Sequence, residues 1–371
     1  MVSIARMGAA TVVVALSITA CGSSSKSSGT GATSAAAGTS AAGASAGSSS
    51  AAAGSSTAAM KDVSLKIMVG GISKQIYLPN ELTAKLGYFK EQHLNVTLID
   101  EASGQSSEQQ VLAGGVQAGS GSYNHTIELQ PSGKFIESVV QLQLAPGEAL
   151  MVNSKQASSI TSAKALSGKN LGVTELGSGT QTLTSAIMGE VGLDPNSGHF
   201  IPVGAGDTFI AAVQHNKIAA GMTTEPTISR LIKTGAAKVL VDLRTPTTTR
   251  AALGGDYPFI CLFMKTDYVN SHKDVVQRLV NAYVKTLKWM AAHTATEIAD
   301  MMPTDYYAGD KAAYITALEG QKASFTPDGV MPATGAQTVY SIEQKYVPIM
   351  KGKTADVSKS YTNEFASKAT G

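Results

Sequence analysis

The sequence predicts an α/β protein built from two doubly wound lobes. From residue 61 onward, short apolar strands alternate with helical stretches, as in βαβ units, which form parallel sheets. The strands are too many for one small sheet, and a length of 371 residues suits about two domains. Ligands of doubly wound sheets bind at the carboxyl ends of the strands, so we look for functional residues there.

Composition excludes two classes of protein. The chain is 43% hydrophobic and 15% charged, and its formal net charge is +2. A protein that reads nucleic acid through bulk basic charge would be strongly positive, and an acidic disordered chain would be strongly negative. The hydrophobic fraction is that of a globular protein with sizeable cores.

The N-terminus is typical of an export signal. Arg6 is the one charge before residue 26, and Met7 to Ala20 form an apolar run too short to span a bilayer comfortably. The run ends in Ile18-Thr19-Ala20-Cys21, which resembles the lipobox of bacterial lipoproteins. The resemblance implies a signal peptide over residues 1–20 and a lipid on the sulfur of Cys21. An ordinary secretory signal is the alternative.

A flexible tether is predicted between the signal and the globular part. Residues 22–59 contain Gly, Ser, Ala and Thr with a single lysine, so they cannot bury enough apolar surface to fold. We therefore assign residues 21–60 to the lipidated cysteine and a tether that spans roughly 30–35 Å. The second cysteine, Cys261, lies in an apolar run and is predicted to be a buried core residue.

Within the globular part, the elements follow from local patterns. Alternating apolar residues or short apolar runs predict strands over 63–70, 94–99, 116–122, 136–144, 169–174, 200–203, 218–222, 237–241 and 257–264. Helical periodicity predicts helices over 80–92, 108–113, 180–190, 208–215, 228–233, 274–292, 295–302, 312–319 and 336–350.

A series of motifs over residues 168–226 carries a family resemblance. The strand Gly168–Val173 is followed by the turn Gly177-Ser178-Gly179-Thr180, and the segment closes with Ile218-Ala219-Ala220-Gly221-Met222-Thr223-Thr224-Glu225-Pro226. This order resembles the second lobe of the substrate-binding proteins of ABC importers. Within them it is most similar to the nitrate/sulfonate/taurine family, whose fold is shared with thiamine-pyrimidine-binding proteins. The resemblance extends over about residues 61–350.

The resemblance implies a domain organisation. Two α/β lobes of the type II periplasmic binding protein kind are joined by a two-stranded hinge and close on a ligand. Lobe 1 would comprise 61–150 plus 256–350, lobe 2 would comprise 151–255, and 351–371 would be a C-terminal tail. The hinge is expected near Leu150–Val152 and near Tyr257–Phe259.

Candidate ligand residues of the second lobe follow strands. Gly177, Ser178, Gly179 and Thr180 lie between a strand and a helix, where backbone N–H groups and the helix dipole favour an anion. A simply capped helix start is the alternative, and a P-loop is excluded because its lysine is missing. Thr224 and Glu225 follow another strand. Three roles are open for the carboxylate of Glu225: binding an ammonium group, ordering the hinge, or contacting the permease.

Candidate ligand residues of the first lobe also follow strands, and the resemblance places ligand contacts in these loops. They are Gly71, Ser73 and Gln75 after the first strand, Ser122, Tyr123, Asn124 and His125 after the third, and Tyr257 beside the hinge. Tyr123 and Tyr257 are alternatively core aromatics, and Lys74 is either a ligand for an anion or a solvated side chain.

The expected function is binding rather than catalysis. No catalytic triad, metal-ligand spacing or nucleotide loop is present, so we expect no catalytic residue, cofactor or metal. The resemblance implies a monomeric, lipid-anchored protein on the outer face of the cell membrane, with ABC permease and ATPase subunits as partners and no nucleic acid. Its ligand would be a sulfonate, taurine, nitrate or an aromatic carboxylate. The alternatives are a thiamine pyrimidine or riboflavin-type ligand, and a sensor without transport.

Overall fold

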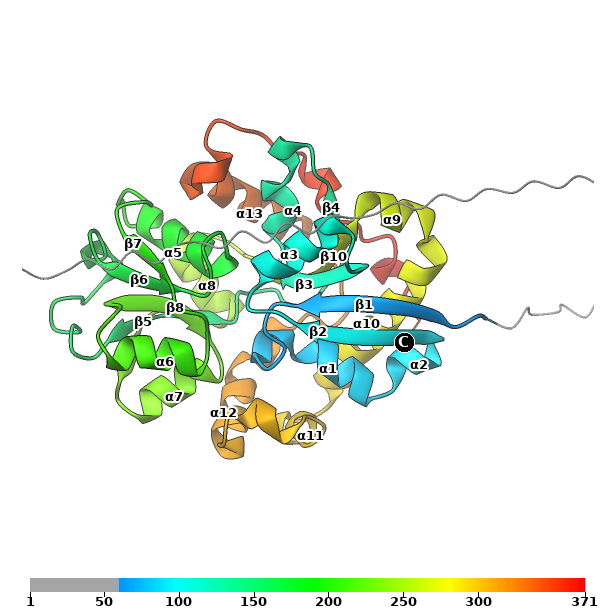
Figure 1. Ribbon diagram of the computed structural model, residues 1–371, viewed down its shortest axis with the longest axis horizontal. Coiled ribbons are helices and arrows are strands. Elements are labelled where there is room, and N and C mark those ends of the chain that lie inside the picture. Colours follow the sequence, from blue (N-terminus) through cyan, green and yellow to red (C-terminus); the bar gives the residue numbers. More distant parts are fainter. Residues whose placement is uncertain (1–59, 371) are drawn as a thin grey trace, which may run out of the picture. The chain divides into compact units, whose positions relative to one another are not determined.

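A computed structural model describes residues 60–370, which fold around two five-stranded sheets (Figure 1). The predicted signal peptide, Cys21 and the tether lie outside the described residues. We use first lobe for the sheet with strand order β2-β1-β3-β10-β4 and the helices on it. We use second lobe for the sheet with order β7-β6-β8-β5-β9 and its helices.

The first sheet is mostly parallel. β1 lies between β2 and β3 and is parallel to both, while β10 is antiparallel to β3 and β4. Its strands are β1 (Val63–Val69), β2 (Leu94–Asp100), β3 (Ala118–Ser122), β4 (Ile136–Gln141) and β10 (Ile260–Lys265).

The second sheet repeats this arrangement. β6 is parallel to β7 and β8, and β5 is antiparallel to β8 and β9. Its strands are β5 (Glu148–Asn153), β6 (Asn170–Val173), β7 (His199–Pro202), β8 (Ala220–Thr224) and β9 (Ala237–Leu243). Two α/β lobes of the same topology confirm the predicted fold class.

Helices cover both faces of each sheet (Figure 1). Those of the first lobe are α1 (Leu78–Lys85), α2 (Tyr88–Glu91), α3 (Gly104–Ala113), α4 (His125–Glu128), α9 (Thr266–Ser271), α10 (Lys273–Ala292), α11 (Ala295–Asp300), α12 (Lys311–Gln321) and α13 (Ala333–Tyr346). Those of the second lobe are α5 (Gly179–Glu190), α6 (Asp207–Gln214), α7 (Thr227–Lys233) and α8 (Pro246–Leu253). Single-turn 3₁₀ helices lie between them, among them Gln75–Tyr77 directly before α1.

Three local predictions are wrong. The helix expected over 80–92 is interrupted at Gly87, which takes a left-handed φ of 77° that ends α1 and starts α2. A helix that we did not predict, α8, begins with a capping box in which Thr245 and Thr248 exchange hydrogen bonds. Leu150–Val152 do not form the hinge, because they pair with β8 and β9 in the middle of β5.

Two segments cross between the lobes, from β4 to β5 and from β9 to β10. Each leads directly into the antiparallel strand of the other sheet. The segments are hydrogen-bonded to each other at the first-lobe end, where Phe259 N–H donates to Gln143 O at 3.1 Å and Gln143 N–H donates to Ile260 O at 3.0 Å. Two rigid sheets joined by two short segments suit hinge closure.

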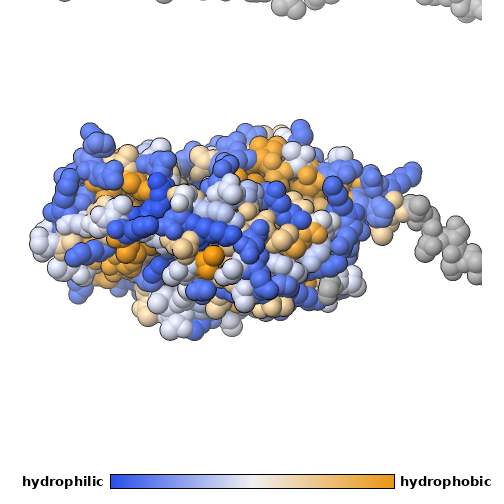
Figure 2. Space-filling view, turned by 90° about the horizontal axis from the view of Figure 1, so that it is seen from below, coloured by the Kyte–Doolittle hydropathy of each residue, from blue (hydrophilic) through white to orange (hydrophobic). Residues whose placement is uncertain are grey.

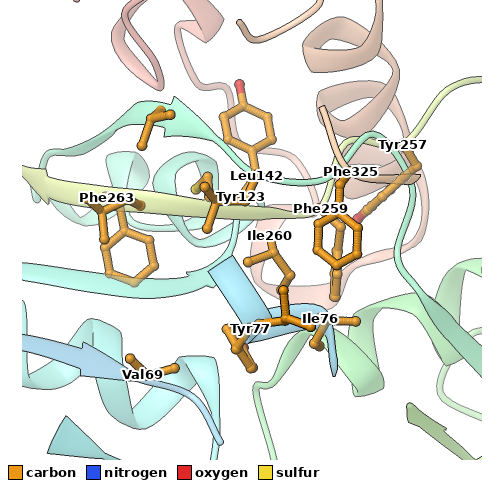
Figure 3. Packing of buried hydrophobic residues seen from close by; sticks show 14 of the residues in the cluster. Val69, Ile76, Tyr77, Tyr123, Leu142, Tyr257, Phe259, Ile260, Phe263 and Phe325 are labelled. Atoms are coloured by element: carbon orange, nitrogen blue, oxygen red, sulfur yellow. The ribbon is translucent and has the colours of Figure 1, made fainter. Parts of the chain in front are cut away.

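The cores explain the apolar runs of the sequence. β10 is fully buried except at its last residue, and Cys261 lies within it. Burial raises the pKa of the Cys261 thiol to about 12, so it is a small core residue without a thiolate, as predicted. Figure 3 shows the packing around Ile260 and Phe263 of this strand.

The C-terminal segment packs on the first lobe. Ser138 N–H of β4 donates to Ser360 O at 2.9 Å, and Phe365 is buried. On the face shown in Figure 2, apolar side chains form separate patches that hydrophilic ones interrupt. Among residues 60–370, no helix is long and apolar enough to cross a membrane.

Candidate functional site

A small cavity lies where strand ends of both lobes meet. Its volume is about 20 Å³, close to the space that one water molecule occupies. β3 and β8 end at it, and segments that follow β1 and β6 complete its wall. It is lined by Lys74, Ile76, Tyr77, Gly104 and Ser122 of the first lobe, by Glu148, Thr174, Ser178, Gly179, Thr180, Thr223 and Thr224 of the second, and by Phe259 of a crossing segment.

The start of α5 gives this cavity a wall of hydroxyl and backbone N–H groups. Thr180 Oγ1 accepts from Thr174 N–H at 2.9 Å, and Ser178 Oγ lies 2.7 Å from Thr180 Oγ1 and donates to Glu175 O at 2.7 Å. Ser178 is the N-cap residue, yet its side chain makes no capping bond to the helix. The first N–H groups of α5 therefore keep their capacity to bind a negatively charged or polar group.

Gly179 allows the two lobes to approach each other. A Cβ atom at this position would lie 2.6 Å from Phe259 Cζ and 2.7 Å from Ser122 Oγ of the first lobe. Both distances are far below van der Waals contact, so no side chain fits here while the lobes are this close. The glycine is a requirement of the closed arrangement.

Two charged side chains reach the same cavity. Lys74 bends back, so that its Nζ donates to Gly70 O at 2.7 Å and to Ala102 O at 3.1 Å. Glu148, the first residue of β5, is 4% exposed, and its Oε2 has no hydrogen-bond partner. Burial lowers the pKa of Lys74 to about 8 and raises the pKa of Glu148 to about 8, each against the attraction of the other group.

Direct contacts hold the lobes together around the cavity. Gln75 N–H of the first lobe donates to Glu225 O of the second at 3.1 Å. Ser103 and Ser106, at the start of α3, both donate to Glu175 Oε2, the latter at 2.8 Å. These bonds join the two lobes directly, so they require the lobes to lie as close as they do here.

Five of the predicted ligand residues are brought together. Ser122, Ser178, Gly179, Thr180 and Thr224 line the cavity, although Thr224 Oγ1 already donates to Gly147 O at 2.8 Å. Gly71 and Ser73 instead line a neighbouring groove of about 670 Å³, which shares Lys74 with the cavity.

Two predicted aromatic ligand residues point elsewhere. Tyr123 is fully buried in the first lobe, and its hydroxyl bonds the Ser360 hydroxyl. In Figure 3 its ring points away from Ile76, Tyr77 and Phe259, which lie together at the lobe junction. Tyr257 is also fully buried and does not line the cavity. Core packing, the alternative reading, describes both in this structure.

Four other predicted residues are occupied by structural contacts. Gln75 donates to Tyr314 O at 2.8 Å and accepts from Gln321. Glu225 pairs with Arg244 at 3.2 Å and accepts from Ser229 N–H at 2.9 Å. Gly177 N–H donates to Gln181 Oε1 at 2.8 Å, and Asn124 Nδ2 donates to Glu128 Oε1 at 2.9 Å; neither residue reaches the cavity.

His125 belongs to a buried ionisable cluster rather than to the cavity. Its Nδ1 lies 3.2 Å from Glu108 Oε2 and 3.6 Å from Glu128 Oε2. Burial lowers the pKa of His125, but the two carboxylates outweigh this effect and raise it overall. Glu128 also accepts from Thr182 of α5 at 3.3 Å, so the cluster connects the two lobes.

We expect Tyr257→Phe to weaken folding rather than binding. Tyr257 Oη donates to Glu343 Oε1 at 3.0 Å, and both side chains are buried. Loss of this bond should lower the free energy of unfolding by about 1–3 kcal/mol. Solute affinity should stay within about threefold of wild type, because Tyr257 does not line the cavity. A threefold change corresponds to about 0.6 kcal/mol of binding free energy. Denaturant unfolding and calorimetric titration test the two effects; a tenfold loss of affinity with unchanged stability would contradict this assignment.

Several cavity residues were not predicted from the sequence: Ile76, Tyr77, Gly104, Glu148, Thr174, Thr223 and Phe259. Of these residues, Glu148 is the one that the sequence could have indicated, because it is an acidic residue directly before the apolar run Ala149–Val152. The aliphatic and aromatic residues carry no such signal. Within the part of the chain that the structure describes, no cluster of His, Cys, Asp or Glu is arranged to hold a metal ion.

Comparison with known proteins places this chain in a family. The profile described as NMT1/THI5 like matches residues 79–296, more than half of the chain. The chain belongs to the NMT1/THI5-like family. This finding confirms the resemblance seen over residues 168–226. No protein among the curated sequences is similar to the chain.

Solved structures share the fold of this family member. A protein from Bordetella bronchiseptica RB50 is 32% identical, with a TM-score of 0.78 over 82% of this chain and 96% of its own. The alkanesulfonate-binding protein SsuA from Xanthomonas axonopodis pv. citri, bound to MOPS, is 16% identical, with a TM-score of 0.60 over 77% of this chain and 91% of its own. The periplasmic nitrate-binding protein NrtA from Synechocystis PCC 6803 is 12% identical, with a TM-score of 0.64 over 82% of this chain and 87% of its own. The latter two establish the fold alone.

Proposed function

We propose that this protein captures a small organic solute between its two lobes outside the cytoplasmic membrane and delivers it to an ABC importer. The observation that carries the proposal is the shared cavity, to which both lobes and one crossing segment contribute side chains. Such a site forms only when the lobes close, so a binding protein of this kind couples ligand capture to a change in its conformation. Solved proteins of the same fold that bind alkanesulfonate and nitrate support this role.

The chemistry of the cavity supports binding without catalysis. Its hydroxyls from Ser122, Ser178 and Thr180 suit recognition of a polar group, and Tyr77 and Phe259 suit an apolar or aromatic part. No nucleophile is paired with a general base among the lining residues. We propose a sulfonate, taurine, nitrate or an aromatic carboxylate as the solute, with its anionic group at the start of α5, and an aminopyrimidine or flavin-type ring as the alternative.

The hydroxyl wall provides a direct test of the binding site. Replacing both Ser178 and Thr180 with Ala should weaken solute binding by about tenfold or more, because each charge-assisted hydrogen bond contributes roughly 1.5–3 kcal/mol. The helix should persist, since Ala is a good helix former. Titration calorimetry gives the affinity and far-ultraviolet circular dichroism the fold. Unchanged affinity in the double variant would remove the α5 start from the site.

We further propose that the mature protein is a lipoprotein with its lipid on Cys21. The lipobox-like sequence before Cys21 supports this proposal. In a bacterial host, Cys21→Ser should release the protein from the membrane fraction into the soluble one, because no acyl chain remains to anchor it. Fractionation and immunoblotting measure this. A variant that stays lipidated and bound to the membrane would overturn the proposal.

A further inference from the structure

Glu148 is held rigidly at the wall of the cavity. It is the first residue of β5, where its backbone pairs with Thr224 of β8 and Leu243 of β9. Its side chain is almost completely buried and lines the cavity, so it cannot turn outward to water. The sheet therefore fixes the backbone of Glu148 beside the cavity, and burial keeps its carboxyl group inside the protein.

One oxygen of this carboxyl group has no partner in the protein. Oε2 of Glu148 lacks a hydrogen-bond partner, and among residues 60–370 Lys74 is the cation whose charge acts on this carboxyl group. Lys74 is the nearest candidate, but its ammonium group is already bonded to the carbonyl oxygens of Gly70 and Ala102. A buried carboxyl oxygen without a partner destabilises the folded state. Such a cost is typical of a functional group that waits for a ligand.

The rest of the wall complements this acceptor. Opposite chemistry is provided by the start of α5, where the backbone N–H groups of Gly179 and Thr180 have no partner within the helix, while the Ser178 hydroxyl donates to Glu175 O. A second polar atom without a partner, Thr223 Oγ1, lies in the same lining. The cavity thus offers an acidic acceptor and a separate set of donors, which a ligand with a single anionic group would use only in part.

We infer that Glu148 selects the solute by accepting a hydrogen bond from its amino group, so that the cargo is a small amino-bearing molecule. This rests on the proposed function and narrows its substrate class. An amino group satisfies Oε2, and the polar or anionic end of the same molecule faces the donors of Ser178–Thr180. A nitrate ion or an alkanesulfonate without nitrogen leaves the carboxyl group without a partner.

The pH dependence of binding distinguishes solutes that carry an amino group from anions that lack one. Glu148, Lys74 and Tyr77 are the titratable groups that line the cavity, and the pKa values of Glu148 and Lys74 lie near 8. From outside the cavity, Asp100 and Glu175 act on Lys74, and Tyr257 lies within the field of Glu148. An ammonium ligand favours the ionised carboxylate and neutral Lys74, so its affinity rises between pH 6 and 8. An anion without an amino group favours the protonated carboxyl group and charged Lys74, so its affinity falls over the same range.

Matched solutes test the inference. The protein is unfolded and refolded to remove carried-over solute and then titrated calorimetrically at pH 6, 7 and 8. The probes are taurine against isethionate, β-alanine against 3-hydroxypropionate, and 4-amino-2-methyl-5-hydroxymethylpyrimidine against the same ring without its amino group. We expect at least one amino member to bind 100-fold more tightly than its partner. Glu148→Gln should abolish that preference, while Glu148→Asp restores part of it.

A control variant and two contradicting outcomes complete the test of Glu148. Glu319→Gln removes the same charge from an exposed position of α12 and should leave every affinity unchanged. If a solute without an amino group binds as tightly as its partner, or if Glu148→Gln keeps the preference, the inference is wrong while solute capture stands. If no probe of either kind binds, the inference is overturned together with capture of these solutes.

Discussion

Gly179→Ala is expected to weaken solute binding by about 100-fold or more while leaving both lobes folded. A methyl group at this position would overlap Phe259 Cζ and Ser122 Oγ, at 2.6 and 2.7 Å from the new Cβ. The lobes relieve the overlap by separating, which removes the closed state that binds. If the overlap raises the free energy of the closed state by about 3 kcal/mol, the affinity for the solute falls by roughly 100-fold.

The stability of this variant distinguishes lost closure from misfolding. Gly179 is the first residue of α5, where Ala is favoured over Gly by roughly 0.5–1 kcal/mol. We therefore expect the free energy of unfolding to change by no more than about 1 kcal/mol. Gly320→Ala is the matched control, because a Cβ there meets no atom within 4 Å. Tight binding by Gly179→Ala would show that ligand capture does not require this approach of the lobes.

Glu148→Gln is expected to stabilise the protein at alkaline pH. Burial raises the pKa of Glu148 from 4.5 to about 8, so the folded state holds a proton that the unfolded state has released between these values. The folded state then binds more protons than the unfolded one, and stability falls as pH rises from 4.5 to 8. A shift of this size corresponds to on the order of 5 kcal/mol above pH 8. Glutamine does not ionise and avoids this loss.

Denaturant unfolding at pH 5, 7 and 8.5 measures the effect. Because the buried amide also lacks partners, we expect a net gain of about 2–3 kcal/mol at pH 8.5 and little difference at pH 5. The raised pKa values of His125 and Glu343 and the lowered pKa of Glu128 affect both proteins equally. Lys74 loses the attraction of the Glu148 carboxylate in the variant, so the difference reports Glu148 together with Lys74. Parallel stability curves for the two proteins would show that Glu148 titrates normally. A gain in stability together with a loss of function is typical of a binding residue.

The sequence predicted those parts of the site that depend on local backbone chemistry. The turn at Gly177–Thr180 is readable because a helix start needs glycine and hydroxyl residues after a strand. Ser122 and Thr224 are readable because strand ends of doubly wound sheets converge. These residues do meet in the structure, and the family over residues 79–296 is the expected one.

The remaining site residues depend on tertiary contacts that no local pattern encodes. Tyr123 follows β3 directly, yet its ring turns into the core because the C-terminal segment brings the Ser360 hydroxyl to it. Tyr257 has a partner 86 residues away, Glu343 of α13. Glu148 was not expected at the cavity because β5 was assigned to the hinge instead of to the second sheet. The side of the sheet on which such a residue lies depends on the register between strands that are far apart in the sequence.

The measurement that tests the account most directly is titration of wild-type protein and Gly179→Ala with a solute panel after refolding has removed carried-over ligand. The panel holds nitrate, taurine, alkanesulfonates, aromatic carboxylates, pyrimidines and riboflavin. We predict that one class binds wild type with one molecule per chain and binds the variant at least 100-fold more weakly. Equal affinity for both proteins, or no binding of any class, would contradict capture of a small solute by closure of the two lobes.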